Sequence, residues 1–451
     1  MISLDTKRFL RKKKFWIAIV SVIVVALVNF GYSGRGGGNH FDNLYQQAQA
    51  NNEKLFMRYD SSYCIDEDTY VQVQRTLNGF VQDMEEAYKA KDWKQLNTVL
   101  KKQNLMLANA VYQVNKDSDQ SKLYHAYFKQ SDAIMEMVKQ NDLDFPLNLD
   151  VVGNYQFLYS DLFAPEDFVD YQFSARFYDQ LEKQDIGRMD YTTLDSTTVF
   201  IHFLRNMFPL LPIILVGILC YDALQEDRDS GVARILLSLP IKRVTYIRKK
   251  LTTNMKSVFM VFLMPMPIIS LGLGLFDHFH TLKAPILANV EGITSFQTLE
   301  NSLDGLAKRN FEKEEFLGLT KYYPMPEYAK SPNPEFDFME LWQFVFLVLL
   351  MAALVLMFMV LFHTLCTVIF RNKMLALVAS LLVLLIASFL AQPSNVGLLY
   401  ALVPFTFFNP VDILSGYTSY SYLNGILILS MYNIILYLLI VWLYNKKDIV
   451  S

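Results

Sequence analysis

The chain has 451 residues, of which 53% are hydrophobic and only 19% are charged. This composition indicates a protein that crosses a membrane several times rather than a set of soluble domains. The net charge of −3 says little by itself because opposite charges are segregated along the chain, and we expect no nucleic-acid partner. The three cysteines, Cys64, Cys220 and Cys366, lie far apart and predict neither a disulfide framework nor a metal site.

The first 14 residues are rich in lysine and arginine and lead directly into an apolar run at residues 15–32. The positive-inside rule places this basic tail in the cytoplasm and makes the apolar run the first transmembrane helix. A secretory signal peptide has the same pattern and is the alternative. Residues 33–38 contain no Ala-x-Ala cleavage site, so we favour a helix that is retained.

Residues 33–196 form a polar insertion that is too long for a simple loop, and acidic residues outnumber basic ones within it. Helical periodicity near 68–90, 92–114 and 121–140, without hairpin signals, predicts a mainly helical extracellular domain. Aromatic residues gather between 155 and 178. We expect them to form the core of this domain; a surface that binds an amphipathic or peptidic substrate is the alternative.

The second apolar segment, residues 197–221, carries His202 and Arg205 near its outer end and Pro209 and Pro212 further in. Ionisable residues inside a membrane span are candidates for a substrate path. Close to the interface, however, long side chains also snorkel toward water. The two prolines predict a kink. Together these four residues form our candidate substrate path.

A charge-dense stretch at residues 222–253 separates the second and third apolar segments. Four apolar residues in it recur at the spacing of one helical face, and Pro240 ends the pattern. These apolar residues are Val232, Ile235, Leu236 and Leu239. Acidic residues precede the pattern and basic residues follow it, which suits the helix dipole. We predict an amphipathic helix over 231–239 at the membrane surface, with an ordinary cytosolic surface helix as the alternative.

The remaining segments complete an all-α polytopic membrane protein with six transmembrane helices. Its extracellular domain is inserted between the first two helices, and both termini are cytoplasmic. In chain order we expect a third span at 254–276, an extracellular loop at 277–337, a fourth span at 338–370, a fifth at 374–391, an outer re-entrant or interfacial hairpin at 392–422, a sixth span at 423–444 and a cytoplasmic tail at 445–451.

The charge-dense stretch resembles a signature of the membrane subunits of ABC type-2 exporters, E-x4-G-T-x-x-x-L-L-x-x-P-x-x-R. Glu226 is followed after four residues by Gly231, then by the run LLSLP at 236–240 and by Arg243. Val232 stands where the family usually has threonine. In the family this stretch docks on the nucleotide-binding subunit. The resemblance therefore implies a coupling interface formed by Glu226, Arg228, Asp229, Gly231, Arg234, Leu236, Leu237, Leu239, Pro240 and Arg243.

Two further motifs are similar to those of the same family. The run PFTFFNPVD at 404–412 resembles the P-F-x-x-x-N-P motif found late in such permeases, and NKKD at 445–448 is similar to the basic-basic-Asp tail. The chain contains no G-x-x-x-x-G-K-[ST] phosphate loop, no H-E-x-x-H and no G-x-S-x-G motif, and its six histidines are scattered. It is therefore not expected to be an enzyme or to bind a cofactor or metal itself. ATP and Mg²⁺ are expected on a separate partner chain.

The resemblance implies a permease subunit of an ATP-driven exporter in a bacterial plasma membrane. Its implied partners are two cytoplasmic ABC ATPase subunits and a second permease subunit, either identical or a paralogue. The acidic, aromatic external domain suits amphipathic substrates such as antimicrobial or signalling peptides, or drugs. A membrane sensor or receptor with an extracellular ligand-binding domain is the alternative. An ion-driven secondary transporter would show paired ionisable groups in mid-membrane and internal repeats, and neither is clear here.

Overall fold

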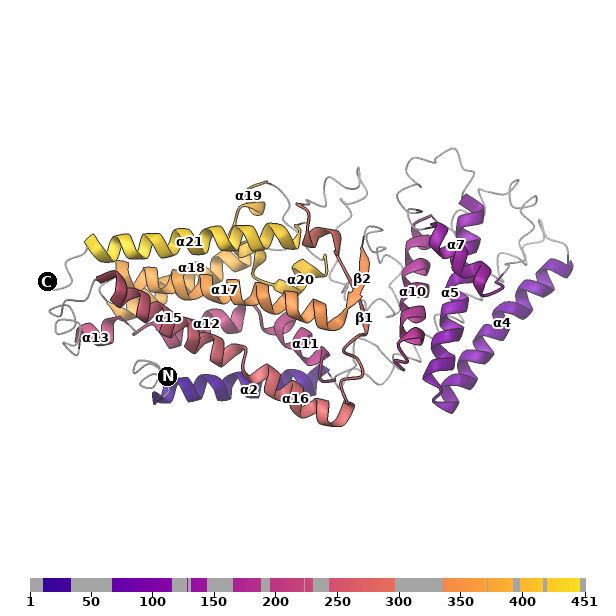
Figure 1. The fold of residues 1–451 in the computed structure, drawn as a ribbon, viewed down its shortest axis with the longest axis horizontal. Helices are drawn as coiled ribbons and strands as arrows, with labels where there is room; N and C mark the ends of the chain where they lie inside the picture. Colours follow the sequence, from indigo (N-terminus) through magenta and orange to yellow (C-terminus); the bar gives the residue numbers. More distant parts are fainter. Residues whose placement is uncertain are drawn as a thin grey trace.

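The computed structural model of the protein describes residues 11–33, 67–115, 128, 131–143, 165–187, 195–222, 224–229, 243–296, 336–370, 372–391, 398–416 and 420–446. Within these residues the chain is almost entirely helical, which confirms the predicted helical character, and the described sheet has two strands. The molecule is elongated, with a bundle of long helices at one end and a smaller helical group at the other (Figure 1).

The bundle and the smaller group are joined by the sheet. The elements of the bundle are α2 (Lys13–Ser33), α11 (Thr198–Met207), α12 (Leu210–Cys220), α13 (Gln225–Asp229), α15 (Arg243–Phe262), α16 (Pro265–Asp277), α17 (Leu341–Ile369), α18 (Lys373–Leu390), α19 (Leu398–Ala401), η3 (Pro404–Phe407), α20 (Pro410–Leu414) and α21 (Tyr422–Lys446). The smaller group contains α4 (Glu67–Ala90), α5 (Trp93–Asn115), α7 (Ser131–Gln140) and α10 (Pro165–Lys183). Between them lie β1 (Pro285–Ala288), η2 (Glu291–Ile293) and β2 (Asp337–Glu340).

Four segments of the described chain are long and apolar enough to cross a membrane: α15 with α16, α17, α18 and α21. A fifth candidate is α11 with the helix that starts at Leu210, which are bent by 76° relative to each other. The break lies at Phe208 and Pro209, because proline has no N–H and its ring clashes with the preceding turn. The predicted first span is helical as α2. The full set of six spans stays a prediction.

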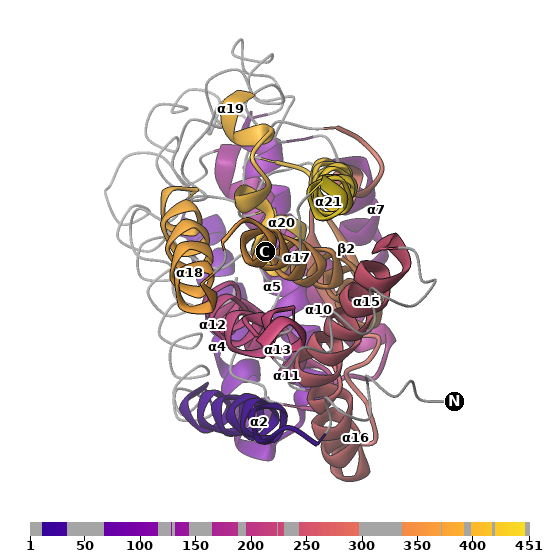
Figure 2. The ribbon, with the colours of Figure 1, turned by 90° about the vertical axis from the view of Figure 1, so that its left-hand side faces the viewer.

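Helix α17 lies in the middle of the bundle, with α12, α15, α18 and α21 around it (Figure 2). Its sequence is apolar on all sides, as expected of a helix that other helices enclose. Fully buried side chains such as Phe344, Met351 and Met359 occur along its length. The core of the bundle is therefore organised around this one helix.

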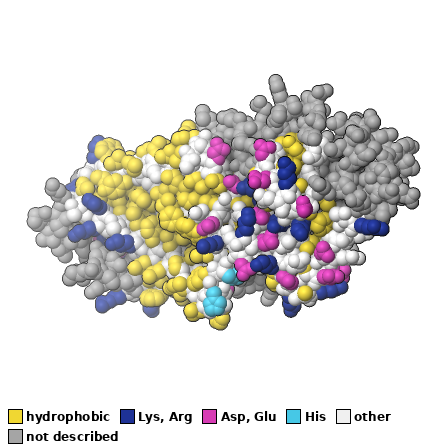
Figure 3. Space-filling model, turned by 45° about the vertical axis from the view of Figure 1, so that its right-hand side comes forward, with side chains coloured by type: hydrophobic (Ala, Val, Ile, Leu, Met, Phe, Trp, Pro, Cys, Tyr) yellow, Lys and Arg dark blue, Asp and Glu magenta, His cyan; other side chains and the backbone are white. Residues whose placement is uncertain are grey.

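The outer helices present large apolar side chains to the surface. Ile17 on α2, Leu275 on α16, Phe389 on α18 and Ile434 on α21 are all more than half exposed. An apolar band crosses this part of the molecule, with charged side chains at either side of it (Figure 3). Soluble monomers rarely expose apolar patches of this extent. We infer that lipid covers the band.

Two helix starts differ from the predicted segment boundaries. Residues 338–340 belong to β2, so the helix of the predicted fourth span begins only at Leu341. The helix of the predicted third span, in contrast, begins early, at Arg243, and is interrupted just before Pro265. Pro265 carries no N–H for the helical ladder, which is the reason that the helix is interrupted there.

The pairing of β1 with β2 was not predicted from the sequence. The strands are antiparallel, with Pro285 opposite Glu340 and Ala288 opposite Asp337. Both strands are only four residues long, and most of the intervening chain lies outside the described residues. Strands this short, far apart in sequence and without an adjoining turn signal, leave no local pattern to detect.

The sheet supports the helical group at the far end of the molecule. Arg176 of α10 forms an ion pair with Asp337 of β2. The rings of Phe173 and Phe338 pack edge to face, with centroids 5.9 Å apart. Since β2 leads directly into α17, this contact connects α10 with the central helix of the bundle.

Helices α4, α5, α7 and α10 pack around buried aromatic and aliphatic side chains. Phe168, Phe173 and Phe177 of α10 are fully buried, and Phe128 packs edge-on against Phe168 at 4.8 Å between ring centroids. Phe168 therefore lies in the core of this helical group, whereas Phe173 packs against the sheet, and residues 155–163 lie outside the described chain. Of the helix expected at 121–140, the structure describes α7.

A polar contact joins α5 to α10. Lys101 Nζ lies 2.5 Å from a carboxylate oxygen of Glu182 and 3.6 Å from one of Asp179, and the Lys101 side chain is only 10% exposed. Burial raises the pKa of the Glu182 carboxyl, but hydrogen bonds from Lys101 and Thr98 lower this pKa by more, so the net shift is downward.

The downward shift predicts a pH-dependent contribution to stability. Because the folded-state pKa of Glu182 lies below its unfolded-state value of about 4.3, the carboxylate stabilises the fold above that pH and loses its effect as pH falls through the folded-state pKa. We expect Lys101→Met to speed hydrogen exchange in α5 and α10 at pH 7, and much less at an acidic pH at which the Glu182 carboxyl is protonated in the folded protein. Exchange mass spectrometry of both proteins at each pH measures this. Lys89→Met, at an exposed pair with Glu85, is the control that should change little.

Candidate functional site

A polar cluster lies at the end of the bundle that is remote from α4, α5, α7 and α10 (Figure 1). Here α2 begins, α12 ends, and α13 leads toward the predicted coupling helix. The described part of the coupling stretch is α13 together with the chain from Arg243 onward. Residues 230–242 lie outside the described chain, so the predicted helix at 231–239 stays a prediction.

Two lysines of α2 and the turn before it bind the acidic chain that follows α12. Lys14 Nζ donates to the carbonyl oxygen of Leu219 at 2.9 Å and forms an ion pair with Asp222. Lys12 forms an ion pair with Glu226 of α13. The last carbonyls of a helix lack intrahelical partners, and cations near that end are favourable. Lys14 therefore caps α12 at the point where the chain leaves the bundle.

On its other side α13 is bound to α15 and α17 through buried polar groups. The Asp227 side chain is only 3% exposed; it accepts a hydrogen bond from the Tyr246 hydroxyl at 2.7 Å and lies 2.6 Å from Lys250 Nζ. Gln225 Nε2 donates to the carbonyl oxygen of Phe370, which follows α17, at 3.2 Å. A buried carboxylate needs such partners, because leaving a charge unpaired in a low-dielectric site is costly.

The same cluster reaches the end of α21. The rings of Tyr246 and Tyr444 stack, with centroids 6.0 Å apart. Arg243 Nη1 donates to the carbonyl oxygen of Asn445 at 3.3 Å. Five helices therefore meet around α13 directly or through Tyr246: α2, α12, α15, α17 and α21.

The structure describes only part of the predicted coupling interface. Glu226 and Arg243 both contact their own chain, as given above. Arg228 and Asp229 lie in α13, but their side chains are outside the described set. The rest of the predicted interface falls within 230–242 and is likewise not described: Gly231, Arg234, Leu236, Leu237, Leu239 and Pro240.

Several residues of the polar cluster were missed by sequence reasoning: Lys12, Lys14, Asp222, Asp227 and Lys250. A usable signal was present, since a basic segment before the first span and an acidic segment after the second were both expected at one membrane face. The basic residues were used only to orient the spans. Opposite charges placed at the same face also predict contact between the segments that carry them.

The candidate substrate path lies nearer the opposite end of the bundle. His202 is buried on α11. The Arg205 side chain is 18% exposed, and its Nε lies 3.8 Å from Oδ1 of Asp412, on α20. Asn409 Nδ2 donates to Oδ2 of the same carboxylate at 2.6 Å. The structure thus places Arg205 in a contact with α20, a partner that sequence reasoning did not identify.

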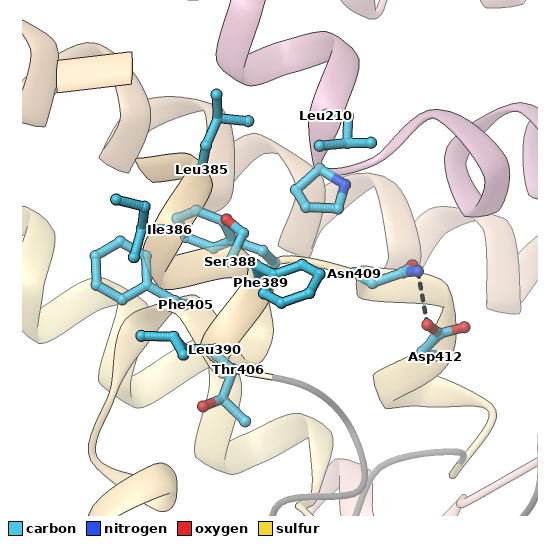
Figure 4. A pocket seen from close by; sticks show the side chains of 13 residues that line it. Leu210, Leu385, Ile386, Ser388, Phe389, Leu390, Phe405, Thr406, Asn409 and Asp412 are labelled. Carbon is cyan, nitrogen blue, oxygen red and sulfur yellow. Dashed lines mark hydrogen bonds between the residues drawn. The ribbon is translucent and has the colours of Figure 1, made fainter. Parts of the chain in front are cut away.

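A cavity of about 560 Å³ adjoins this contact, between the start of α12, the end of α18, η3 and α20 (Figure 4). Its walls are mainly apolar, formed by side chains such as Leu385, Phe389 and Phe405. Its polar groups come from Ser388, Thr406, Asn409 and Asp412. Pockets for small ligands commonly have this size and this combination of apolar walls with a few polar groups.

Of the four predicted path residues, only Pro209 lines the cavity. Arg205 is connected to it through Asp412, whereas His202 and Pro212 are not among its lining residues. Asp412 and Asn409 come from the run that resembles the late permease motif, but no local pattern connects that run with the second span. The connection arises from the fold, which packs α11 against α20.

Comparison with known families identifies the chain. The sequence model described as ABC-2 family transporter protein matches residues 2–283, which is more than half of the 451 residues. The chain belongs to the ABC-2 transporter family. The match includes α2, α13 and the undescribed coupling stretch. No curated protein and no solved structure gives a significant match.

Membership of the ABC-2 family defines the general role of the chain. It is a permease, a multi-pass membrane component of a transporter that associates with ATPase subunits, and such components are generally not catalytic themselves. The apolar helices agree with this role. Among the described residues of this ABC-2 permease, no group of three or more metal-ligating side chains comes together.

The Arg205–Asp412 contact can be tested by a double-mutant cycle in full-length protein. Arg205→Met removes the cation beside a mostly buried carboxylate and should lower the apparent melting temperature by about 2–4 °C. The double variant Arg205→Met/Asp412→Asn should have its melting temperature lowered by less than the sum of the two single variants' decreases, because the two side chains interact. Circular dichroism in detergent measures this. Strictly additive effects would show that the two side chains do not interact.

Proposed function

We propose that this chain is the permease subunit of an ATP-driven exporter that carries amphipathic molecules out of the cell. The main support is the family match, because it extends over the segment that docks on the ATPase in related permeases. Two cytoplasmic ABC ATPase subunits would bind ATP and Mg²⁺, and a second permease subunit would complete the pathway. This chain would contribute the membrane path and receive force through residues 222–253.

The distribution of charge supports a cytoplasmic location for the end of the bundle that carries α13. Basic residues near the first turns of α2, α15 and α18 and the last turn of α21 gather at the end of the bundle that carries α13 (Figure 1). They include Lys12, Lys14, Arg243, Lys250, Lys373 and Lys446. Positive residues are retained on the cytoplasmic side. The opposite end, with α4, α5, α7 and α10, would then be extracellular.

The cavity between α12 and α18 supports an amphipathic substrate. Apolar walls stabilise the hydrocarbon part of a ligand through removal of its surface from water. Asn409, Asp412, Ser388 and Thr406 offer hydrogen-bond partners at the polar part of the wall. Its volume of about 560 Å³ suits a drug-sized molecule or one apolar portion of a peptide.

Association with an ATPase is tested by purifying the tagged full-length chain from gently solubilised membranes. We expect a P-loop subunit that hydrolyses ATP to be recovered with it. Arg234→Glu should greatly reduce this recovery, because it reverses a charge in the predicted coupling helix. Lys89→Glu, an exposed charge reversal on α4, is the matched control. Recovery of wild-type chain alone would favour the sensor alternative.

The cavity is tested by filling it. Ser388→Trp places a large ring in the cavity, so ATP-driven uptake of an amphipathic dye into inside-out vesicles should fall to background while the ATPase still co-purifies. Ile434→Trp is the control, because this α21 side chain is 61% exposed and does not line the cavity. Normal uptake by the Ser388 variant would exclude the cavity from the substrate path.

A further inference from the structure

We propose that Asp227, together with Tyr246, Lys250, Lys14 and Asp222, positions α13 as a rigid link between the coupling segment and the bundle. This inference rests on the proposed function. It assigns these groups a role inside the permease rather than in contact with the ATPase. They are positioning residues, since they hold the element from which the coupling segment emerges.

Helix α13 has only five residues. A helix this short is unstable by itself, because the backbone order needed for the first turn outweighs the few hydrogen bonds that it gains. Its position must therefore come from contacts with its surroundings. The chain continues from α13 into residues 230–242, so whatever fixes α13 also fixes one end of the coupling segment.

The contacts on α13 come from different sides. Asp227 is bound by Tyr246 and Lys250, both on α15. Glu226, the preceding residue, is bound by Lys12 next to α2. Gln225 is bound to the end of α17. Three successive side chains of α13 are therefore attached to three different parts of the bundle, and α13 cannot shift without moving them or breaking polar contacts.

The attachment of α13 to α15 is largely buried. The Asp227 side chain is 3% exposed and that of Lys250 is 16% exposed, so water cannot easily replace either partner. Tyr246 adds a neutral donor, and its ring stacks on Tyr444 of α21. A buried charge with satisfied partners is strongly destabilised when one partner is removed. This attachment should therefore persist while the coupling segment moves.

The chain is also held at the point where it leaves α12. Lys14 binds both the Leu219 carbonyl and the Asp222 carboxylate, so it spans the last turn of α12 and the chain that leads to α13. A displacement of the coupling segment would then pass into α2 and α15 together. Without these contacts the junction would absorb the displacement, and ATP hydrolysis would proceed without transport.

The test compares coupling ratios in full transporter complexes: ATP-driven dye uptake divided by ATP hydrolysed. Asp227→Asn keeps the shape of the side chain but removes its charge, and it should lower this ratio at least about fivefold while the ATPase subunit still co-purifies. Tyr246→Phe removes one hydroxyl and should cause a smaller drop in the same direction. Lys89→Glu is the control for a charge change remote from α13.

A charge exchange gives an independent readout that a general loss of folding would not produce. Lys14→Asp and Asp222→Lys should each lower the coupling ratio, and the double variant should recover a substantial part of it. Elution of each variant as a complex in size-exclusion chromatography checks its assembly. If Asp227→Asn does not assemble, the coupling ratios of Tyr246→Phe and of the exchange variants still test whether these contacts position α13.

Two results would overturn the inference while leaving the proposed function intact. The first is a wild-type coupling ratio in Tyr246→Phe, Asp227→Asn and both single exchange variants. The second is loss of the ATPase subunit from a correctly assembled Asp227→Asn permease, which would place Asp227 at the subunit interface. Failure of the proposed function gives a different result, because wild-type chain would then bring down no ATPase.

Discussion

The constraint on which this structure depends is that lipid offers no hydrogen bonds to the backbone. Each N–H and C=O in the hydrocarbon region needs a partner within the protein, which leaves the α-helix as the natural form for a single apolar segment. The helices of the bundle break at prolines, which have no backbone N–H to donate. One break precedes Pro265, and another lies at Phe208 and Pro209, beside the short elements η3 and α20.

The same constraint separates the polar chemistry into two places. At one end of the bundle, Asp227 binds α13 to α15 through a largely buried ion pair with Lys250 and a hydrogen bond from Tyr246. Toward the other end, Arg205, Asp412 and Asn409 form a polar contact beside a mainly apolar cavity. Between them α17 provides an apolar core in contact with both regions.

Much of the helical framework could be predicted from the sequence, because its signals are local. The periodicity near 68–90 and 92–114 corresponds to α4 and α5, and the prolines mark the observed breaks. The β1–β2 pair was missed because its strands are four residues each and pair across a long interval. Local patterns carry no information about such a partner.

In both candidate sites, single residues could be identified from the sequence but their partners could not. Glu226 could be identified because a linear motif contains it, but its partner Lys12 is 214 positions away and no motif joins them. Arg205 could be selected as an ionisable residue in an apolar segment, whereas its contact with Asp412 depends on how α11 packs against α20. Chemistry that depends on one segment can be predicted from sequence, and chemistry that depends on packing between segments needs the structure.

The central claim is that ATP hydrolysis by a partner drives transport through this permease. It is tested most directly by dye uptake into proteoliposomes that contain the purified complex, with all ion gradients collapsed. We predict uptake with ATP and none with a non-hydrolysable ATP analogue. Uptake that continues without ATP hydrolysis, or that requires an ion gradient, would contradict the account.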